Sequence, residues 1–338
     1  MYHCTRNSQE SMNKKLLTLT AIFVLGLGSM LKAQDAHFSQ FYANPIYLNP
    51  AFAGTSQCPR VSLNYRNQYP VLSIYQTYSA TYDQYVESLN GGLAIMLMQD
   101  EAGDGAFATT DVAVAYSYHL KASRKFTVLA GFQAGYRQIN LNWNSFTFPD
   151  QIDPYFGFVR ESSEVPPGNN STGVVDLSAG LIGYTEKFYF GVAASHLTSP
   201  DVGFFVQDKL PTKIAAHAGL IIPLGRKRLY TDLQNYLLPN VVYQNQGPYN
   251  QLTSNISFAR GDISGGLGYR VSSFNPDAIV ILLGYAPIEG QWGVGYSYDF
   301  TVSGLNNDLG GAHEISLNYR LPCRTVRKKT KAINCPKF

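Results

Sequence analysis

The sequence predicts an all-β protein, a transmembrane outer-membrane β-barrel of about 14 antiparallel strands, since bacterial barrels of this kind have an even strand number. Three observations predict it. Charged residues are only 14% of the 338 residues, whereas tyrosine, phenylalanine and glycine are abundant, at 24, 19 and 30. Most segments alternate large apolar and small polar residues with the period of two that marks strands. Long and short connections alternate between these segments, as external loops and periplasmic turns do in such barrels.

The bulk composition argues against other classes. The mean hydropathy of −0.12 does not fit a helical membrane protein. The formal net charge is +3, and no long basic stripe precedes the C-terminus, so nucleic acid is not an expected partner.

Residues 1–33 are predicted to be a secretory signal peptide, with an N-terminal extension, that is cleaved off. Lys14 and Lys15 form a short positive region, the apolar run Leu16–Leu31 follows, and Ala33 precedes the expected cleavage site. The alternative is a single membrane anchor, but the run is shorter than the roughly 20 residues that span a bilayer.

Residues 34–59 are expected to be a periplasmic or lumen-packed N-terminal segment that approaches the barrel from the periplasmic side. The pairs Asn44-Pro45 and Asn49-Pro50 are turn signals rather than strand signals. The aromatic content argues against free disorder, and a partner-binding surface is the alternative. The candidate partner contacts in this segment are His37, Phe38, Phe41, Tyr42, Tyr47 and Phe52.

Residues 60–321 are predicted to form the barrel. In Asp111–Leu120 and in Trp292–Phe300, one face carries Val, Leu, Tyr, Trp or Phe, and the other face is mostly Gly, Ala and Ser with a few charges. A soluble β-sandwich also alternates. However, many of these segments have the roughly 9–11 residues that cross a bilayer, whereas ordinary strands average about five or six.

The connections predict the topology. Asn142–Gly173, Leu197–Thr212 and Leu237–Gln251 are expected as long external loops, and turns such as Val86–Asn90 and Thr185–Lys187 are expected on the periplasmic side. Both ends of the mature chain would then lie in the periplasm.

The first of these long loops is rich in aromatic residues. Exposed aromatics on a loop stiffened by proline suit a protein partner. The alternative is that the loop folds into the barrel mouth as a plug. The candidate partner contacts here are Trp143, Phe146, Phe148, Tyr155, Phe156 and Phe158.

Residues 322–338 are predicted to be a basic periplasmic tail. Cys323 and Cys335 share this tail and are candidates for a disulfide in an oxidising periplasm, which would leave Cys58 over. Free thiols are an equally good interpretation, because spacing alone does not settle pairing.

No catalytic, cofactor-binding or metal-binding residues are predicted. The histidines are scattered, and no serine motif accompanies them. The acidic run Gln99–Gly105 lacks the ligand spacing of a calcium loop, so a solvated hairpin tip is expected there.

Several runs resemble the PorP/SprF family, outer-membrane proteins of the type IX secretion system of Bacteroidota. One of these runs, Ala332–Phe338, is closer to the SprF branch than to PorP. The runs are Gln34–Phe41, Asn44-Pro45, Leu48–Gly54, His313–Ile315, Tyr319-Arg320 and Ala332–Phe338.

This resemblance implies a non-enzymatic role in export and cell-surface attachment of a large adhesin that carries a C-terminal type IX signal, as in gliding. It also implies contacts with other type IX components, including periplasmic ones, besides outer-membrane lipid. The alternative function is an outer-membrane channel or hydrophobic-solute transporter of the same shape.

Overall fold

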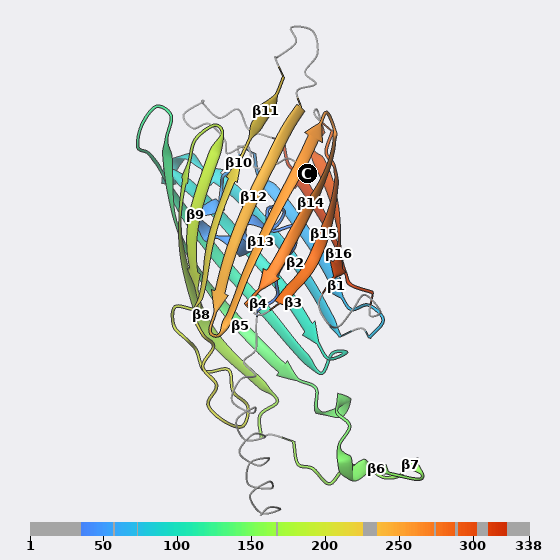
Figure 1. Cartoon of the computed structure of the whole chain (residues 1–338). Coiled ribbons are helices and arrows are strands. Elements are labelled where there is room, and N and C mark those ends of the chain that lie inside the picture. Colours follow the sequence, from blue (N-terminus) through green and yellow to red (C-terminus); the bar gives the residue numbers. More distant parts are fainter. Residues whose placement is uncertain are drawn as a thin grey trace, which may run out of the picture. The chain divides into compact units, whose positions relative to one another are not determined.

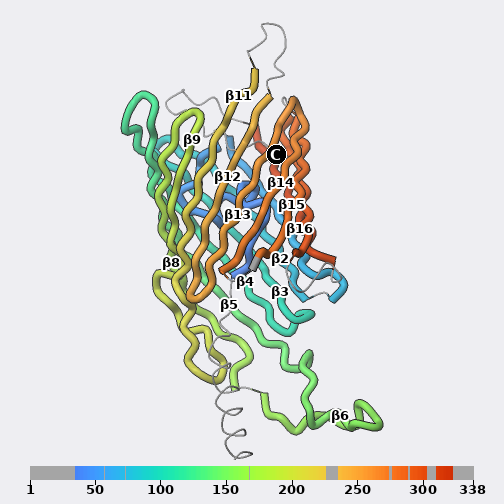
Figure 2. Tube along the Cα trace, in the orientation of Figure 1, coloured from blue at the N-terminus to red at the C-terminus, as the bar shows by residue number. Residues whose placement is uncertain are grey.

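The described part of the computed structural model is residues 35–322, except residues 57, 73, 167, 226–234, 274, 288–289 and 303–309. From Ala36 onward it is a tilted antiparallel β-barrel (Figures 1 and 2). The sheet carries 15 strand labels, but β10 and β11 are two parts of one strand, so the wall has 14 strands and the prediction is confirmed. The barrel closes where β1 pairs with β17.

Consecutive strands are neighbours around the wall, and β10 also pairs with β12. The wall strands are β1 (Arg60–Gln68), β2 (Tyr75–Val86), β3 (Gly91–Ala102), β4 (Phe107–Lys121), β5 (Thr127–Leu141), β8 (Ser171–Tyr184), β9 (Phe188–Ser195), β10 (Lys213–Leu220), β11 (Ile222–Leu224), β12 (Asn235–Gln246), β13 (Tyr249–Arg260), β14 (Ile263–Ser272), β15 (Asn275–Tyr285), β16 (Trp292–Thr301) and β17 (Ala312–Arg320).

A proline accounts for the break between β10 and β11. The ladder to β12 pairs Gly219 with Asn240 and then Ile222 with Leu237, so Leu220 and its neighbour are skipped opposite Pro239. Proline has no N–H to donate to a ladder and is found in sheets only where a pairing is missing. The missing pairings of Leu220 and its neighbour let this proline lie inside a wall strand.

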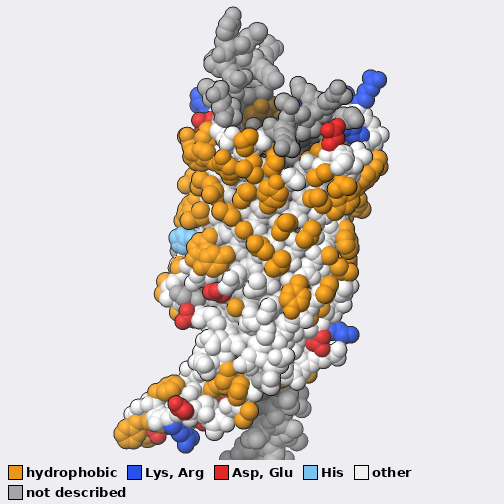
Figure 3. Space-filling model, turned by 180° about the vertical axis from the view of Figure 1, so that it is seen from behind, with side chains coloured by type: hydrophobic (Ala, Val, Ile, Leu, Met, Phe, Trp, Pro, Cys, Tyr) orange, Lys and Arg blue, Asp and Glu red, His pale blue; other side chains and the backbone are white. Residues whose placement is uncertain are grey.

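Side chains alternate across the wall as the sequence predicts. On β4, Val112 and Val114 are 44% and 54% exposed on the outer face, whereas Ala113, Ala115 and Ser117 are buried on the inner face. On the face shown in Figure 3, hydrophobic side chains are spread over the wall and charged ones are few. This outer band is the lipid-facing surface of an outer-membrane barrel.

The two ends of the barrel differ in their connections. One end, here called the loop end, carries the connection between β5 and β8 and the one between β9 and β10. The opposite end, here called the turn end, carries tight connections such as Thr185–Lys187.

The prediction of a long external loop over Leu237–Gln251 is wrong. Those residues belong mostly to β12 and β13, which are joined by Gly247 and Pro248 alone. The proline and asparagine in Leu238–Asn240 resembled a turn, but the interrupted partner strand accommodates them within the ladder. Long and short connections therefore do not alternate all the way around.

Two short helical turns precede the wall, α2 (Pro45–Leu48) and the 3₁₀ turn η1 (Pro50–Phe52). Among the described residues, no helix has the length and apolar character to cross a membrane.

Candidate functional site: a plugged lumen and an exposed aromatic hairpin

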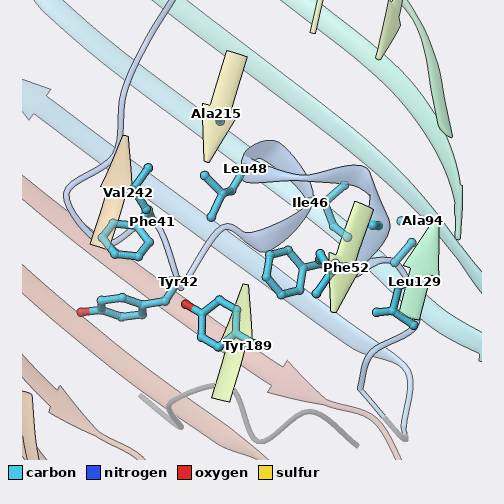
Figure 4. Packing of buried hydrophobic residues seen from close by; sticks show 14 of the residues in the cluster. Phe41, Tyr42, Ile46, Leu48, Phe52, Ala94, Leu129, Tyr189, Ala215 and Val242 are labelled. Carbon is cyan, nitrogen blue, oxygen red and sulfur yellow. The ribbon is translucent and has the colours of Figure 1, made fainter. Parts of the chain in front are cut away.

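Residues Ala36–Thr55, here called the plug, fill the inside of the barrel. Ile46, Leu48 and Phe52 are buried against inner-face residues such as Leu129 and Tyr189 (Figure 4). Burying a side chain of this size contributes roughly 1.5–3 kcal/mol. The plug therefore supplies the hydrophobic core that an empty barrel of this width would lack.

Glycines of the wall make room for the plug. A Cβ at Gly131 would lie 2.2 Å from the amide nitrogen of Ala51. A Cβ at Gly180 would lie 2.0 Å from Oδ1 of Asn49. Gly131 leaves room for the backbone of the plug, and Gly180 leaves room for the Asn49 side chain.

A buried ionic cluster holds the start of the plug. Asp299 lies 2.8 Å from both Arg66 and Arg270, and Glu314 lies 3.2 Å from Arg66. All four side chains are at most 3% exposed. Since buried charges are stable only when paired and hydrogen-bonded, the cluster is one cooperative unit.

Ser39 of the plug completes this cluster. Its hydroxyl donates to Asp299 at 2.7 Å and accepts from Arg66 at 3.1 Å and from Arg270 at 3.0 Å. The Glu314 carboxylate accepts the backbone N–H groups of Ser39 at 2.8 Å and of Gln40 at 3.0 Å. The plug is thus bound by charge-assisted hydrogen bonds, which are about twice as strong as neutral ones.

The other end of the plug is fixed by polar contacts on β2, β8, β9 and β10. The amide of Asn49 donates to the Leu181 and Val192 carbonyls and contacts His217 at 3.0 Å. The Gly54 N–H donates to Asp83 at 3.0 Å. Both ends of the plug are therefore tied to the wall.

The plug runs through the lumen from the loop end to the turn end. His37 contacts Arg66, near the last residue of β1, and Tyr47 contacts Lys213, the first residue of β10. Gly54, by contrast, contacts Asp83, which pairs with the first residue of β1. Because β17 ends beside that same residue, the start of the plug and the end of β17 lie at opposite ends of the barrel. Residues 323–338 lie outside the described part of the chain, so the placement of both ends of the mature chain in the periplasm stays a prediction.

The structure places the six candidate contacts of the N-terminal segment in the plug. Phe38, Phe41, Tyr42 and Phe52 are at most 9% exposed. Phe52 stacks on His217 at 5.3 Å between ring centroids. These aromatics pack against the wall of their own barrel, and a partner contact for them stays a prediction.

The longest described connection projects from the loop end as a small hairpin, away from the barrel (Figure 1). Its strands are β6 (Ile152–Asp153) and β7 (Gly157–Phe158), and the residues 150–163 are here called the aromatic hairpin. Tyr155, Phe156 and Phe158 are 92%, 82% and 64% exposed, well beyond the lipid-facing side chains of β4. The connection does not fold into the mouth, so the expected alternative of a loop plug is wrong.

Local hydrogen bonds hold the turn of the aromatic hairpin. Oδ1 of Asp153 accepts the N–H groups of Tyr155 and Phe156 at 2.8 and 3.0 Å, which fixes the turn. Asp150 accepts from the Ser163 N–H at 2.7 Å. That bond, with others from Ser162 and Ser163, lowers the pKa of the Asp150 carboxyl below its ordinary value.

The remaining three candidate aromatics form a cluster at the base of this connection. Trp143 lies 4.8 Å from Phe148 and 6.1 Å from Phe146 between ring centroids. Trp143 also contacts Phe205 from the connection between β9 and β10, at 6.3 Å. The cluster braces the two long connections against each other.

Sequence reasoning missed the ionic cluster. Its members are isolated charges on the small-residue face of strands β1, β14, β16 and β17, and each by itself resembles a lumen-facing polar residue. The signal that could have indicated the cluster is a charged residue on the face of a strand that is otherwise made of small residues. Which charges meet depends on the closure of the barrel.

Cys58 is in a disulfide bond, so the expectation that it would be the cysteine left over is wrong. Cys323 and Cys335 lie outside the described residues, as do the signal peptide and the basic tail. Within the described ranges, no group of three or more His, Cys, Asp or Glu side chains is arranged to hold a metal ion.

Comparison with known families decides the identity of this plugged barrel. The family model described as "Type IX secretion system membrane protein PorP/SprF" matches residues 30–319. The chain belongs to this family. It is therefore a membrane component of the type IX secretion system, and its barrel belongs in the outer membrane.

Other comparisons are distant. No curated protein matches the chain. Among solved structures, the Acinetobacter baumannii outer membrane protein Omp33 is 10% identical, with a TM-score of 0.43, over 79% of this chain and 100% of that one. The CymD monoaromatic hydrocarbon channel is 12% identical, with a TM-score of 0.44, over 87% of this chain and 96% of that one. Likenesses this weak add nothing to what the strand pairing shows.

Proposed function

We propose that this protein is a non-enzymatic outer-membrane anchor, of the SprF branch, that assists export of a large adhesin and holds it at the cell surface. The proposal places the loop end outside, as in other outer-membrane barrels. The observation that carries it is the aromatic hairpin, a rigid and almost fully exposed group of aromatic side chains at that end. Aromatic anchors on a preorganised backbone are typical centres of protein interfaces.

The charges around the hairpin favour a protein over the membrane as its occupant. Residues 142–170 carry four acidic side chains and a single basic one, Arg160. Anionic lipid headgroups would repel such a surface. A protein with an apolar pocket and a basic rim is the complementary partner.

The filled lumen supports an anchor rather than a passive pore. The plug lies in the lumen and is bound along its length by buried contacts. A channel or hydrophobic-solute transporter of this fold would have to move the plug in each cycle.

Deletion of the gene, followed by proteomics of the cell surface, tests the proposal. Loss of one large adhesin with other secreted proteins unaffected is expected. Loss of all type IX cargo would indicate a core component of PorP type instead. An unchanged surface with altered solute uptake would overturn the proposal and favour the transporter.

Complementation then tests the hairpin. The Tyr155→Ser/Phe156→Ser variant is expected to restore the barrel but not the surface adhesin. The matched control is Val71→Ser/Leu72→Ser, which removes two exposed apolar side chains, 68% and 47% exposed, from the connection between β1 and β2 at the same end. Equal restoration by both variants would exclude the hairpin as the docking site.

A further inference from the structure

The wall holds much of the plug through main-chain atoms. Glu314 accepts two consecutive N–H groups, Asp83 accepts the Gly54 N–H, and Ser117 donates to the Ala51 carbonyl at 2.8 Å. His119 lies 3.0 Å from the Ala53 carbonyl. Because every polypeptide offers these groups, such contacts bind a main chain largely without regard to its side chains, as in other peptide-binding proteins.

The inner wall also carries polar groups that the plug does not use. Asn64 on β1, Thr81 on β2, and Asn255 and Ser257 on β13 are at most 4% exposed. Each has side-chain polar atoms without a hydrogen-bond partner within the described part of the chain. Buried polar groups are normally paired, so these positions are spare donors and acceptors for a polypeptide in the lumen.

The route of the plug shows that the lumen accommodates a polypeptide over its full length. The segment enters beside Arg66 at the loop end and leaves beside Asp83 at the turn end. Gly131 leaves space for its backbone where it passes the strand.

We infer that the inner wall is a binding site for a polypeptide segment, occupied here by the chain's own plug, and that a segment of another polypeptide takes the same place when the plug leaves. This inference rests on the proposed function, since the natural occupant would be a segment of an exported protein. The recognition chemistry is a main-chain turn with two consecutive free N–H groups facing Glu314. A side chain no larger than that of Ala51 is required where the occupant passes Gly131.

The test uses the full chain in detergent micelles with the plug loosened in two independent ways. Ser39→Pro/Gln40→Pro removes both N–H donors to Glu314, and Gly131→Ala places a Cβ against the plug backbone. The probe is a labelled synthetic peptide of residues 36–55. It is expected to bind saturably to each variant and about tenfold or more weakly to the native protein, where the plug competes.

Two modified peptides test main-chain recognition. The peptide with Ser39→Gly and Gln40→Gly keeps both N–H groups and is expected to bind. The peptide with proline at both positions lacks them and is expected to bind about tenfold or more weakly than the glycine peptide, since two charge-assisted hydrogen bonds are lost.

The inference is overturned if the folded variants bind no peptide, or if the proline and glycine peptides bind equally. It is also overturned if both variants keep the plug in place, as shown by unchanged ion conductance in planar bilayers, because a plug that cannot be loosened cannot be exchanged. Surface proteomics of the deletion strain is independent of these outcomes. Loss of the adhesin without peptide binding would remove this inference alone and leave the proposed function standing.

Discussion

The plug and the aromatic hairpin are both short, aromatic, proline-containing segments, yet one is buried and the other is exposed. Phe52 is 2% exposed in the plug, and Phe156 is 82% exposed in the hairpin. The plug is held by groups from distant strands, including Asp299 and Glu314. The hairpin is held by its own Asp150 and Asp153. The comparison teaches that a similar aromatic content goes with burial where distant strands supply the polar contacts, and with exposure where the segment supplies its own.

The largest loss of stability is expected from a change in the ionic cluster that binds the start of the plug. Asp299→Asn removes the carboxylate that pairs with Arg66 and Arg270 and leaves two buried guanidinium groups without it. The free energy of unfolding should fall by about 3–5 kcal/mol, as measured by denaturant titration in micelles. Glu164→Gln, on the exposed connection, is the control and should change it by less than about 0.5 kcal/mol. Equal losses for the two variants would show that the cluster is not a stabilising unit.

The second prediction concerns the space the wall leaves for the plug. Gly131→Ala should cost about 1–3 kcal/mol through overpacking and should raise ion conductance in planar bilayers as the plug is displaced. Gly265→Ala is the matched control, because the nearest atom to its added Cβ is 3.9 Å away. An unchanged ion conductance of the Gly131→Ala barrel would indicate that the plug backbone shifts without leaving the lumen.

A smaller loss of stability is expected when the hydrogen bonds within the aromatic hairpin are removed. Asp153→Ala removes the acceptor of two backbone N–H groups, each bond contributing about 0.5–1.5 kcal/mol. The loss should appear as faster proteolysis at residues 153–158, with no change in the unfolding of the barrel. A change in barrel unfolding would mean that the hairpin is not an independent local unit.

The smallest effect on stability is expected at the hairpin tip. Tyr155→Ser/Phe156→Ser should leave the free energy of unfolding within about 0.5 kcal/mol of the native value, since both side chains are exposed. Phe41→Ser in the plug should by contrast cost about 3 kcal/mol or more, because it buries an unsatisfied hydroxyl and leaves a cavity. Similar costs for the two variants would remove the distinction between the two segments.

The strands could be predicted from sequence because their signal is local. The alternation in Asp111–Leu120 and Trp292–Phe300 directly gives the inner and outer faces, and the structure confirms both. Pro239 shows where local signals fail. Its tolerance depends on a gap in the partner strand, which no feature of its own neighbourhood reveals.

The candidate site was predictable only in part. The N-terminal segment and the long loop were both recognised as more than linkers from their aromatic residues. The role of Gly131 and Gly180, which leave room for the plug, becomes apparent only once the strands are wound into a barrel. The pairing of Arg66 with Asp299 likewise requires β1 to meet β17 and β16 around the closed wall.

The closure of the barrel also orders its folding. The plug precedes every strand in the chain, but its contacts with Asp299 and Glu314 span 260 and 275 residues of sequence. Contacts this remote form late, because the chain entropy lost in closing so long a loop must be offset first. The segment that is synthesised before the barrel therefore reaches its final place only after the last strand has been added.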